Sequence, residues 1–190
     1  MFVNKALELL FLFQFVLRKE WRQTLPEYEH PWVLKALFQE GKLWPELRQN
    51  IQLWWYPPQP PLVFSQPPSS PDVFFHRRLI LWMPYRIWAF KLVCAQPQCA
   101  EHRLTSCGIY KQATQVLDVG GFYHLASEYL EYGKCHKKYI GWSNAILKQV
   151  DVGHRSYFPA ILTYKYFYCL FLKIIIGLNI NKKSVYAQTE

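Results

Sequence analysis

Three cysteines, Cys94, Cys99 and Cys135, are the residues whose types and spacing most clearly suggest chemistry. The first two bound the segment Cys94-Ala-Gln-Pro-Gln-Cys99, and the third ends Tyr132-Gly-Lys-Cys135. Structural zinc sites take four tetrahedral ligands, and thiolates are among the ligands that zinc prefers. The second segment has a tyrosine where a cysteine would complete Cys-x-x-Cys, and a phenol with a pKa near ~10 replaces a thiolate poorly. The spacing therefore predicts a zinc site that lacks one of its cysteines.

The fourth ligand of this predicted site is a histidine or is missing. His102 follows Cys99 closely in the chain and would complete a Cys₃His site, whereas His136 is adjacent to Cys135 and neighbouring residues rarely both reach one ion. We predict zinc bound by Cys94, Cys99, Cys135 and His102. The alternative is that the thiols are buried or free and bind no metal.

The sequence offers little support for catalysis. It contains no GxxxxGKS/T, GxGxxG, HExxH or GxSxG motif. A nuclease-like acidic cluster would need Asp118, Glu128, Glu131 and Asp151 to meet, and acidic residues beside hairpin turns are more often solvated. Cysteine and histidine residues that are distant in sequence do not by themselves indicate a nucleophile and its base. We therefore expect a protein without enzymatic activity.

The charge balance indicates an anionic partner. Lysine and arginine total 22 against 13 aspartate and glutamate, which gives a net charge of +9, and such a surplus is typical of nucleic-acid or membrane-surface binding. We predict contact with nucleic acid through Lys134, Lys137, Lys138 and Arg155. Aromatic residues, 18% of the chain, would stack on bases. The alternative is that the aromatics form the core and the charges a solvated surface.

The cysteine count and the apolar segments indicate the compartment. Five cysteines are an odd number, which favours reduced thiols in an intracellular protein, with the nucleus as a candidate site, over a disulfide framework. Residues 9–17 are uncharged, but no small-x-small cleavage site follows them. Residues 166–172 and 174–178 are each shorter than the about 20 apolar residues that a transmembrane helix needs. We predict no transmembrane span.

The residue pattern predicts an α+β fold: a small antiparallel β hub that resembles a zinc ribbon, with an N-terminal helix and peripheral short helices. An apolar helix is expected over residues 1–25 and a single domain over residues 31–169. Strands are expected at 79–82 and 87–93, and a hairpin at 115–129 around Gly120-Gly121. Helices are expected from Trp32, from Ser143 and from Pro159. The hairpin would return the chain and bring Cys135 beside the first cysteine pair.

A proline-rich segment, residues 57–71, begins at Pro57 and ends at Pro71 and contains seven prolines. Such a segment is extended, without internal hydrogen bonds. It is expected to lie as a strap across the aromatic residues of its own domain. The alternative is a protein-interaction module in which Pro58 and Pro61 supply a PxxP ligand for an SH3-type groove.

Several motifs recur here in one order, among them Leu81-Trp-Met-Pro84, the first cysteine pair, His102-Arg-Leu-Thr-Ser-Cys-Gly-Ile-Tyr110 and Phe158-Pro159-Ala160. Over about residues 32–169 the chain resembles the family called domain of unknown function 6729, which occurs as many copies in animal genes related to mobile elements. The resemblance implies a cysteine pair followed by Cys-x-x-Cys, from which Tyr132 departs. The tail, residues 170–190, also departs, so we expect a truncated copy of a binding module or a remnant of a larger nuclease-like protein.

Overall fold

The computed structural model describes residues 17, 19–39, 46–58, 75–99, 102–162 and 167–169. Residues 1–16 of the expected N-terminal helix, most of the proline-rich segment 57–71 and the tail 170–190 lie outside the described residues. None of the described helices is both long enough and apolar enough to span a bilayer.

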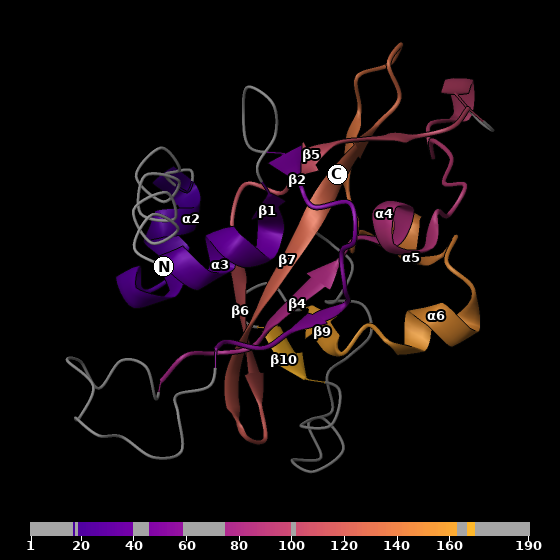
Figure 1. Cartoon of the computed structure of the whole chain (residues 1–190). Coiled ribbons are helices and arrows are strands. Elements are labelled where there is room, and N and C mark those ends of the chain that lie inside the picture. Colours follow the sequence, from indigo (N-terminus) through magenta and orange to yellow (C-terminus); the bar gives the residue numbers. More distant parts are fainter. Residues whose placement is uncertain are drawn as a thin grey trace, which may run out of the picture.

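The described strands form a mixed sheet around the long strand β7 (Gly121–Glu131), which pairs with other strands along its whole length (Figure 1). The main path of the sheet has the order β3 (Trp54–Trp55), β4 (Leu79–Trp82), β7, β6 (Thr114–Asp118), β10 (Phe167–Cys169) and β9 (Ala160–Leu162). The second half of β7 pairs instead with β5 (Thr105–Ile109) and β8 (Lys138–Ile140). Two short strands, β1 (Phe38–Gln39) and β2 (Glu46–Leu47), form a separate antiparallel pair.

The α+β class agrees with the sequence, but the expected antiparallel hub is corrected to a mixed sheet. β4 lies parallel to β7, and β10 lies parallel to β6. All four residues of β4 are buried, as is typical of a strand covered on both faces in a parallel pairing. The chain between β4 and β7 contains only short elements, so the sequence has no long crossover helix to indicate the parallel pair.

Two predictions beside prolines are wrong, both for the same reason. The strand expected at 87–93 is not found, because Pro84 opens the helix α4 (Pro84–Trp88), which ends at the left-handed residue Ala89, φ 53°, and beyond it only Val93 pairs, in an isolated bridge. Pro159 does not open a helix, because β9 follows it, and the helix α6 (Val152–Ser156) comes before it. Proline suits the first turn of a helix, turns and strand edges alike, so the residue alone does not choose among them.

The predicted hairpin is confirmed as β6 and β7. Its register pairs Asp118 with Gly121 and Val116 with Tyr123. Of the two turn glycines, only Gly121 has a positive φ, 118°. The expected helices near Trp32 and Ser143 are α3 (His30–Leu37) and α5 (Asn144–Leu147).

Two helices cover one face of the sheet, and their apolar side chains pack against it to form part of the core. The helices α2 (Lys19–Thr24) and α3 bury Trp21, Val33 and Leu37 against the β4 residues Leu79 and Leu81. On the opposite face, Trp82 and Tyr123 pack among Trp142 and Phe158. A third, smaller cluster surrounds the cysteines near the second half of β7, and its fully buried members include Leu92, Leu104, Leu130 and Ile146.

Candidate metal centre

The first two cysteines lie in a tight loop between two short backbone pairings. Val93 pairs with Arg103 in an antiparallel bridge, and the Cys94 N–H donates to the carbonyl of His102 at 2.9 Å. Between these contacts a 3-10 helix, η3 (Pro97–Cys99), turns the chain. The loop therefore presents Cys94 at its start and Cys99 near its tip.

Cys135 lies in the turn that joins β7 to β8. The two strands pair antiparallel, with Glu131 opposite Lys138. The turn is closed by the N–H of His136, which donates to the carbonyl of Tyr132 at 3.0 Å, and His136 takes a left-handed conformation with φ 53°. Both cysteine segments thus lie at the ends of hairpin-like loops.

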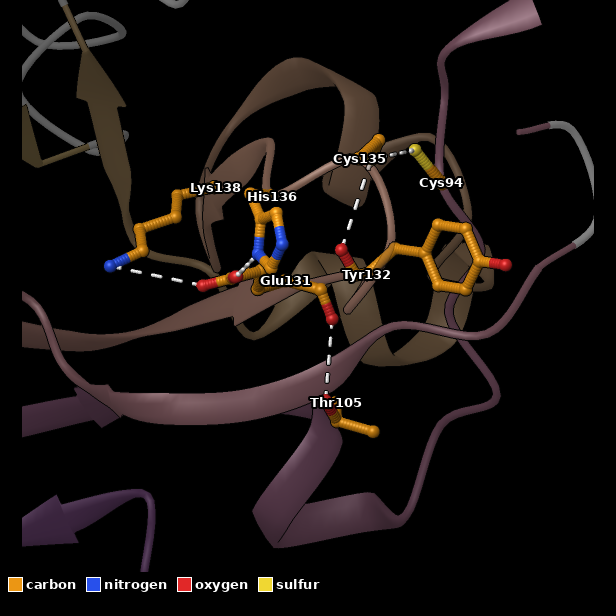
Figure 2. Close-up of polar contacts among 7 residues, drawn as sticks. All are labelled: Cys94, Thr105, Glu131, Tyr132, Cys135, His136 and Lys138. Carbon is orange, nitrogen blue, oxygen red and sulfur yellow. Dashed lines mark hydrogen bonds and ion pairs between the residues drawn. The ribbon is translucent and has the colours of Figure 1, made fainter. Parts of the chain in front are cut away.

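The three sulfur atoms come together. The Sγ atoms of Cys94, Cys99 and Cys135 all lie within 4.8 Å of one another, and Cys94 Sγ is 3.8 Å from Cys135 Sγ (Figure 2). Cys94 and Cys99 are buried, and Cys135 is partly exposed. The predicted convergence is found, although the β7–β8 turn produces it. The β6–β7 hairpin, which we expected to do so, turns at the other end of β7.

The surroundings of the sulfurs affect their protonation differently. Burial raises the pKa of the Cys94 thiol, but the hydrogen bonds of Tyr139, the Gln96 backbone and the other two thiols outweigh it, so this pKa is lowered. Burial and the neighbouring thiols raise the pKa of Cys99. The Tyr139 hydroxyl lies 3.5 Å from Cys94 Sγ, and burial together with Cys94 raises the pKa of Tyr139 to about 12. Tyr139 therefore stays neutral, and its hydroxyl can donate a hydrogen bond to Cys94 Sγ.

Gln149, just beyond α5, fixes the strand segment that leads into Cys94. Its side-chain oxygen accepts from the Val93 N–H at 2.8 Å, and its Nε2 donates to the Val93 carbonyl at 3.0 Å. Nε2 also donates to the carbonyl of Ala145 at 2.9 Å. One side-chain amide thus pairs with the Val93 backbone as a neighbouring strand would. The sequence analysis missed both Gln149 and Tyr139, because neither residue type has a spacing that marks such a role.

His102, the predicted fourth ligand, is not part of the group of converging ligand atoms. Its ring packs instead against the ring of Tyr132, with centroids 4.9 Å apart and planes inclined at 34°. Figure 2 shows the Tyr132 hydroxyl directed away from Cys94 and Cys135. Among the described residues, three of the four predicted ligands come together, all of them cysteines.

The four predicted nucleic-acid contacts do not form one patch. Lys134 and Lys137 share the β7–β8 turn with Cys135, and Lys134 is exposed. The ammonium group of Lys138 lies 3.8 Å from the carboxylate of Glu131, and this ion pair partly neutralises its positive charge. Arg155 belongs to α6, and Figure 1 shows that helix well apart from the β7–β8 turn. Only the turn lysines therefore lie beside the candidate metal centre.

The acidic residues considered for a nuclease-like cluster are dispersed. Asp118 pairs with Arg78, and Asp151 caps α6 by accepting from the His154 N–H at 3.0 Å. Glu131 contacts His136 at 2.8 Å. Glu128 is fully buried, and burial raises the pKa of its carboxyl. Glu128 accepts from the Tyr85 N–H at 3.0 Å, so each of the four carboxylates has its own partner.

Comparison with models of protein families matches residues 21–178 to DUF6729, a domain of unknown function. This match confirms the resemblance drawn from the motifs and extends it at both ends. Neither the search of the curated proteins nor that of the solved structures finds a match.

Proposed function

We propose that this chain, which belongs to the DUF6729 family, is a non-enzymatic binding module in which Cys94, Cys99 and Cys135 hold a zinc ion that joins two loops. The ion would be structural, and the surface around it would contact nucleic acid.

The observation that carries this proposal is the convergence of three sulfurs from two separate loops. Zinc–sulfur bonds of about 2.3 Å in a tetrahedron place sulfurs about 3.8 Å apart. Cys94 Sγ and Cys135 Sγ are 3.8 Å apart, and all three sulfurs lie within 4.8 Å of one another. Soft thiolates favour zinc over magnesium or calcium, which prefer oxygen ligands.

A structural role for the ion is supported by the few contacts that hold the cysteine loops in place. The segment between Cys94 and Cys99 is held by a single β-bridge, a few backbone hydrogen bonds and Gln149. The apolar cluster beneath it is the smallest of the three in the described residues. A metal ion would cross-link the two loops, and because such a site forms only on folding, its binding energy would be folding energy.

The nucleic-acid part of the proposal is supported by charge. The chain carries a net charge of +9, and Lys134 and Lys137 lie in the same turn as Cys135. Neutralising phosphates with lysine releases counterions, so binding would weaken steeply with salt. With two lysines rather than four residues at the turn, their joint replacement by alanine would reduce the salt slope by about 1.4 for a single strand.

Native mass spectrometry of the full chain with added zinc tests the metal site. We expect one zinc ion per chain, its loss on addition of a chelator, and no stable zinc adduct for Cys94→Ser or Cys135→Ser. Cys107→Ser is the matched control, because Cys107 is an exposed free cysteine outside the cluster. Retention of zinc by both ligand variants, or no zinc on the unaltered chain, would overturn the proposal.

A further inference from the structure

Two aromatic rings lie together beside the candidate metal centre. The rings of His102 and Tyr132 have centroids 4.9 Å apart, and their planes are inclined by 34°. His102 is exposed and Tyr132 is partly exposed. Each ring belongs to a different cysteine loop, since His102 follows Cys99 and Tyr132 precedes Cys135. The pair therefore exists only while the two loops are held together.

Two exposed cations lie near the ring residues in the sequence. Arg103 is next to His102 in the chain and is exposed, and Lys134 lies two residues after Tyr132 and is exposed. Among the described residues of these two loops, the acidic residue is Glu131, which contacts His136 and Lys138. Figure 2 shows those three side chains on the side of the turn away from the Tyr132 ring. The described residues beside the two rings in sequence therefore carry positive charge that Glu131 does not neutralise.

We propose that Tyr132, backed by His102, is a stacking platform for a base of single-stranded nucleic acid, with Arg103 and Lys134 placed to contact the adjoining phosphates. This inference rests on the proposed function, because the zinc ion would hold the two rings in one place. Proteins that bind single strands without sequence preference combine aromatic platforms with a positively charged groove or surface. Positive charge suits both a nucleic acid and an acidic peptide, but the ring pair favours the nucleic acid, because its bases can stack on Tyr132 whereas carboxylate side chains cannot.

The platform also gives a physical reason for tyrosine at this position. A cysteine at position 132 would supply a fourth thiolate to the metal but would remove the ring. Tyrosine supplies the ring and leaves the metal with three thiolates. Metal affinity and nucleic-acid affinity should therefore change in opposite directions when Tyr132 is replaced by cysteine.

The test measures fluorescence anisotropy of labelled oligo(dT) and oligo(U) with the zinc-loaded full chain. We expect Tyr132→Ala to weaken binding about tenfold for both oligonucleotides, and Tyr132→Trp and Tyr132→Phe to stay near the unaltered chain. Tyr129→Phe is a matched control, because it leaves a ring in place on β7 outside the platform. Loss with alanine but not with the aromatic variants supports stacking.

Tyr132→Cys separates this inference from the proposed function. We expect it to keep or gain zinc by native mass spectrometry and to lose oligonucleotide affinity as the alanine variant does. If Tyr132→Ala keeps full oligonucleotide affinity while the unaltered chain binds zinc, the platform is wrong and the metal proposal stands. If the unaltered chain binds neither oligonucleotide at low salt, the platform is likewise overturned. If Tyr132→Phe or Tyr132→Trp loses as much affinity as alanine, stacking is not the cause.

Discussion

Among single residues, Tyr132 matters most to the proposed zinc site, because a cysteine at this position would add a fourth thiolate. The turn around it is already closed, since the His136 N–H donates to the Tyr132 carbonyl at 3.0 Å. This backbone geometry does not depend on the tyrosine side chain. A cysteine there could approach the same ion as Cys135 without a new turn.

We therefore expect Tyr132→Cys to raise zinc affinity by at least tenfold, because a fourth thiolate completes the tetrahedron that zinc prefers. Competition with a chromogenic chelator measures the change. Tyr132→Ser, which removes the ring without adding a thiolate, is the control and should show no gain. Equal affinity of the cysteine variant and the unaltered chain would mean that another group already completes the site.

Gln149 gives the second prediction at this scale. Its replacement by alanine leaves the N–H and carbonyl of Val93 without the partners described above. Polar groups left unpaired cost about 1–3 kcal/mol when fully buried and less when partly buried, as the Val93 groups are, and the strand segment that leads into Cys94 would loosen. We expect Gln149→Ala to lower both the free energy of unfolding, measured with urea, and zinc affinity.

The control for this variant is Gln115→Ala, since Gln115 is exposed on β6. It should change neither quantity by more than about 0.5 kcal/mol. A Gln149→Ala protein that is destabilised but binds zinc with unchanged affinity would show that Gln149 supports the core and not the site.

At the scale of elements, close packing fixes how β8 and α5 meet the sheet. Gly141 lies directly after β8, and its carbonyl accepts from Trp82 Nε1 at 3.0 Å. A Cβ atom at this position would lie 2.6 Å from Ser127 Oγ and 3.2 Å from the Trp82 carbonyl oxygen. The Ser127 hydroxyl already donates to that carbonyl at 2.6 Å, so turning away from an added Cβ atom would break this hydrogen bond.

We expect Gly141→Ala to destabilise the fold by about 1–3 kcal/mol, as overpacking of a close-packed core does. Urea unfolding of this variant and of Gly120→Ala gives the comparison. Gly120 lies in the β6–β7 turn, where an added Cβ meets nothing within 4 Å. Equal stability of the two variants would refute the close contact at Gly141.

A buried carboxylate connects the helical layer to the sheet. Glu29, fully buried before α3, accepts from Trp32 Nε1 and from the Arg77 N–H, and His124 lies 3.7 Å from it. Burial raises the pKa of this carboxyl, but its close contact with His124 and its hydrogen bonds with Trp32 and the Arg77 N–H outweigh burial, and the pKa is lowered. A depressed pKa stabilises the fold above the unfolded value of about 4.3, and this stability is lost as the pH falls through the folded pKa.

Glu29→Gln removes the charge and points an amide at groups that are themselves donors. We expect a marked loss of stability at pH 7, and a difference from the unaltered chain that shrinks as the pH falls below the unfolded value of about 4.3 and through the lowered pKa of folded Glu29. Urea unfolding across this pH range checks the sign. A difference that stays constant or widens at low pH would contradict an ionised Glu29.

Part of the fold could be predicted from the sequence, and particular residues show why the rest could not. The β6–β7 hairpin follows from alternating residues around Gly120-Gly121, which are local signals. The parallel pairing of β4 with β7 joins residues 45 apart, such as Leu79 and His124, and no local pattern carries it. At the site, the spacing of the cysteines predicted that three sulfur atoms would come together. The stacking of His102 on Tyr132 depends on how two loops meet in space, which spacing alone does not specify.

At the scale of the whole molecule, β7 connects two differently stabilised regions. Its first half lies between β4 and β6 in the apolar sheet core, and its second half carries β5 and β8 beside the cysteines (Figure 1). The first region is covered on one face by α2 and α3. The second has a smaller core and would gain most from a zinc cross-link.

X-ray absorption at the zinc edge of the zinc-loaded full chain is the most direct test of whether the thiolates of Cys94, Cys99 and Cys135 bind one ion. We predict three sulfur atoms at about 2.3 Å from the zinc and one lighter oxygen or nitrogen atom at about 2.0–2.2 Å. Cys135→Ser should lower the sulfur count or abolish binding, and Cys107→Ser should leave the spectrum unchanged. Zinc with no sulfur neighbours, or a sulfur count that Cys135→Ser does not alter, would contradict the account.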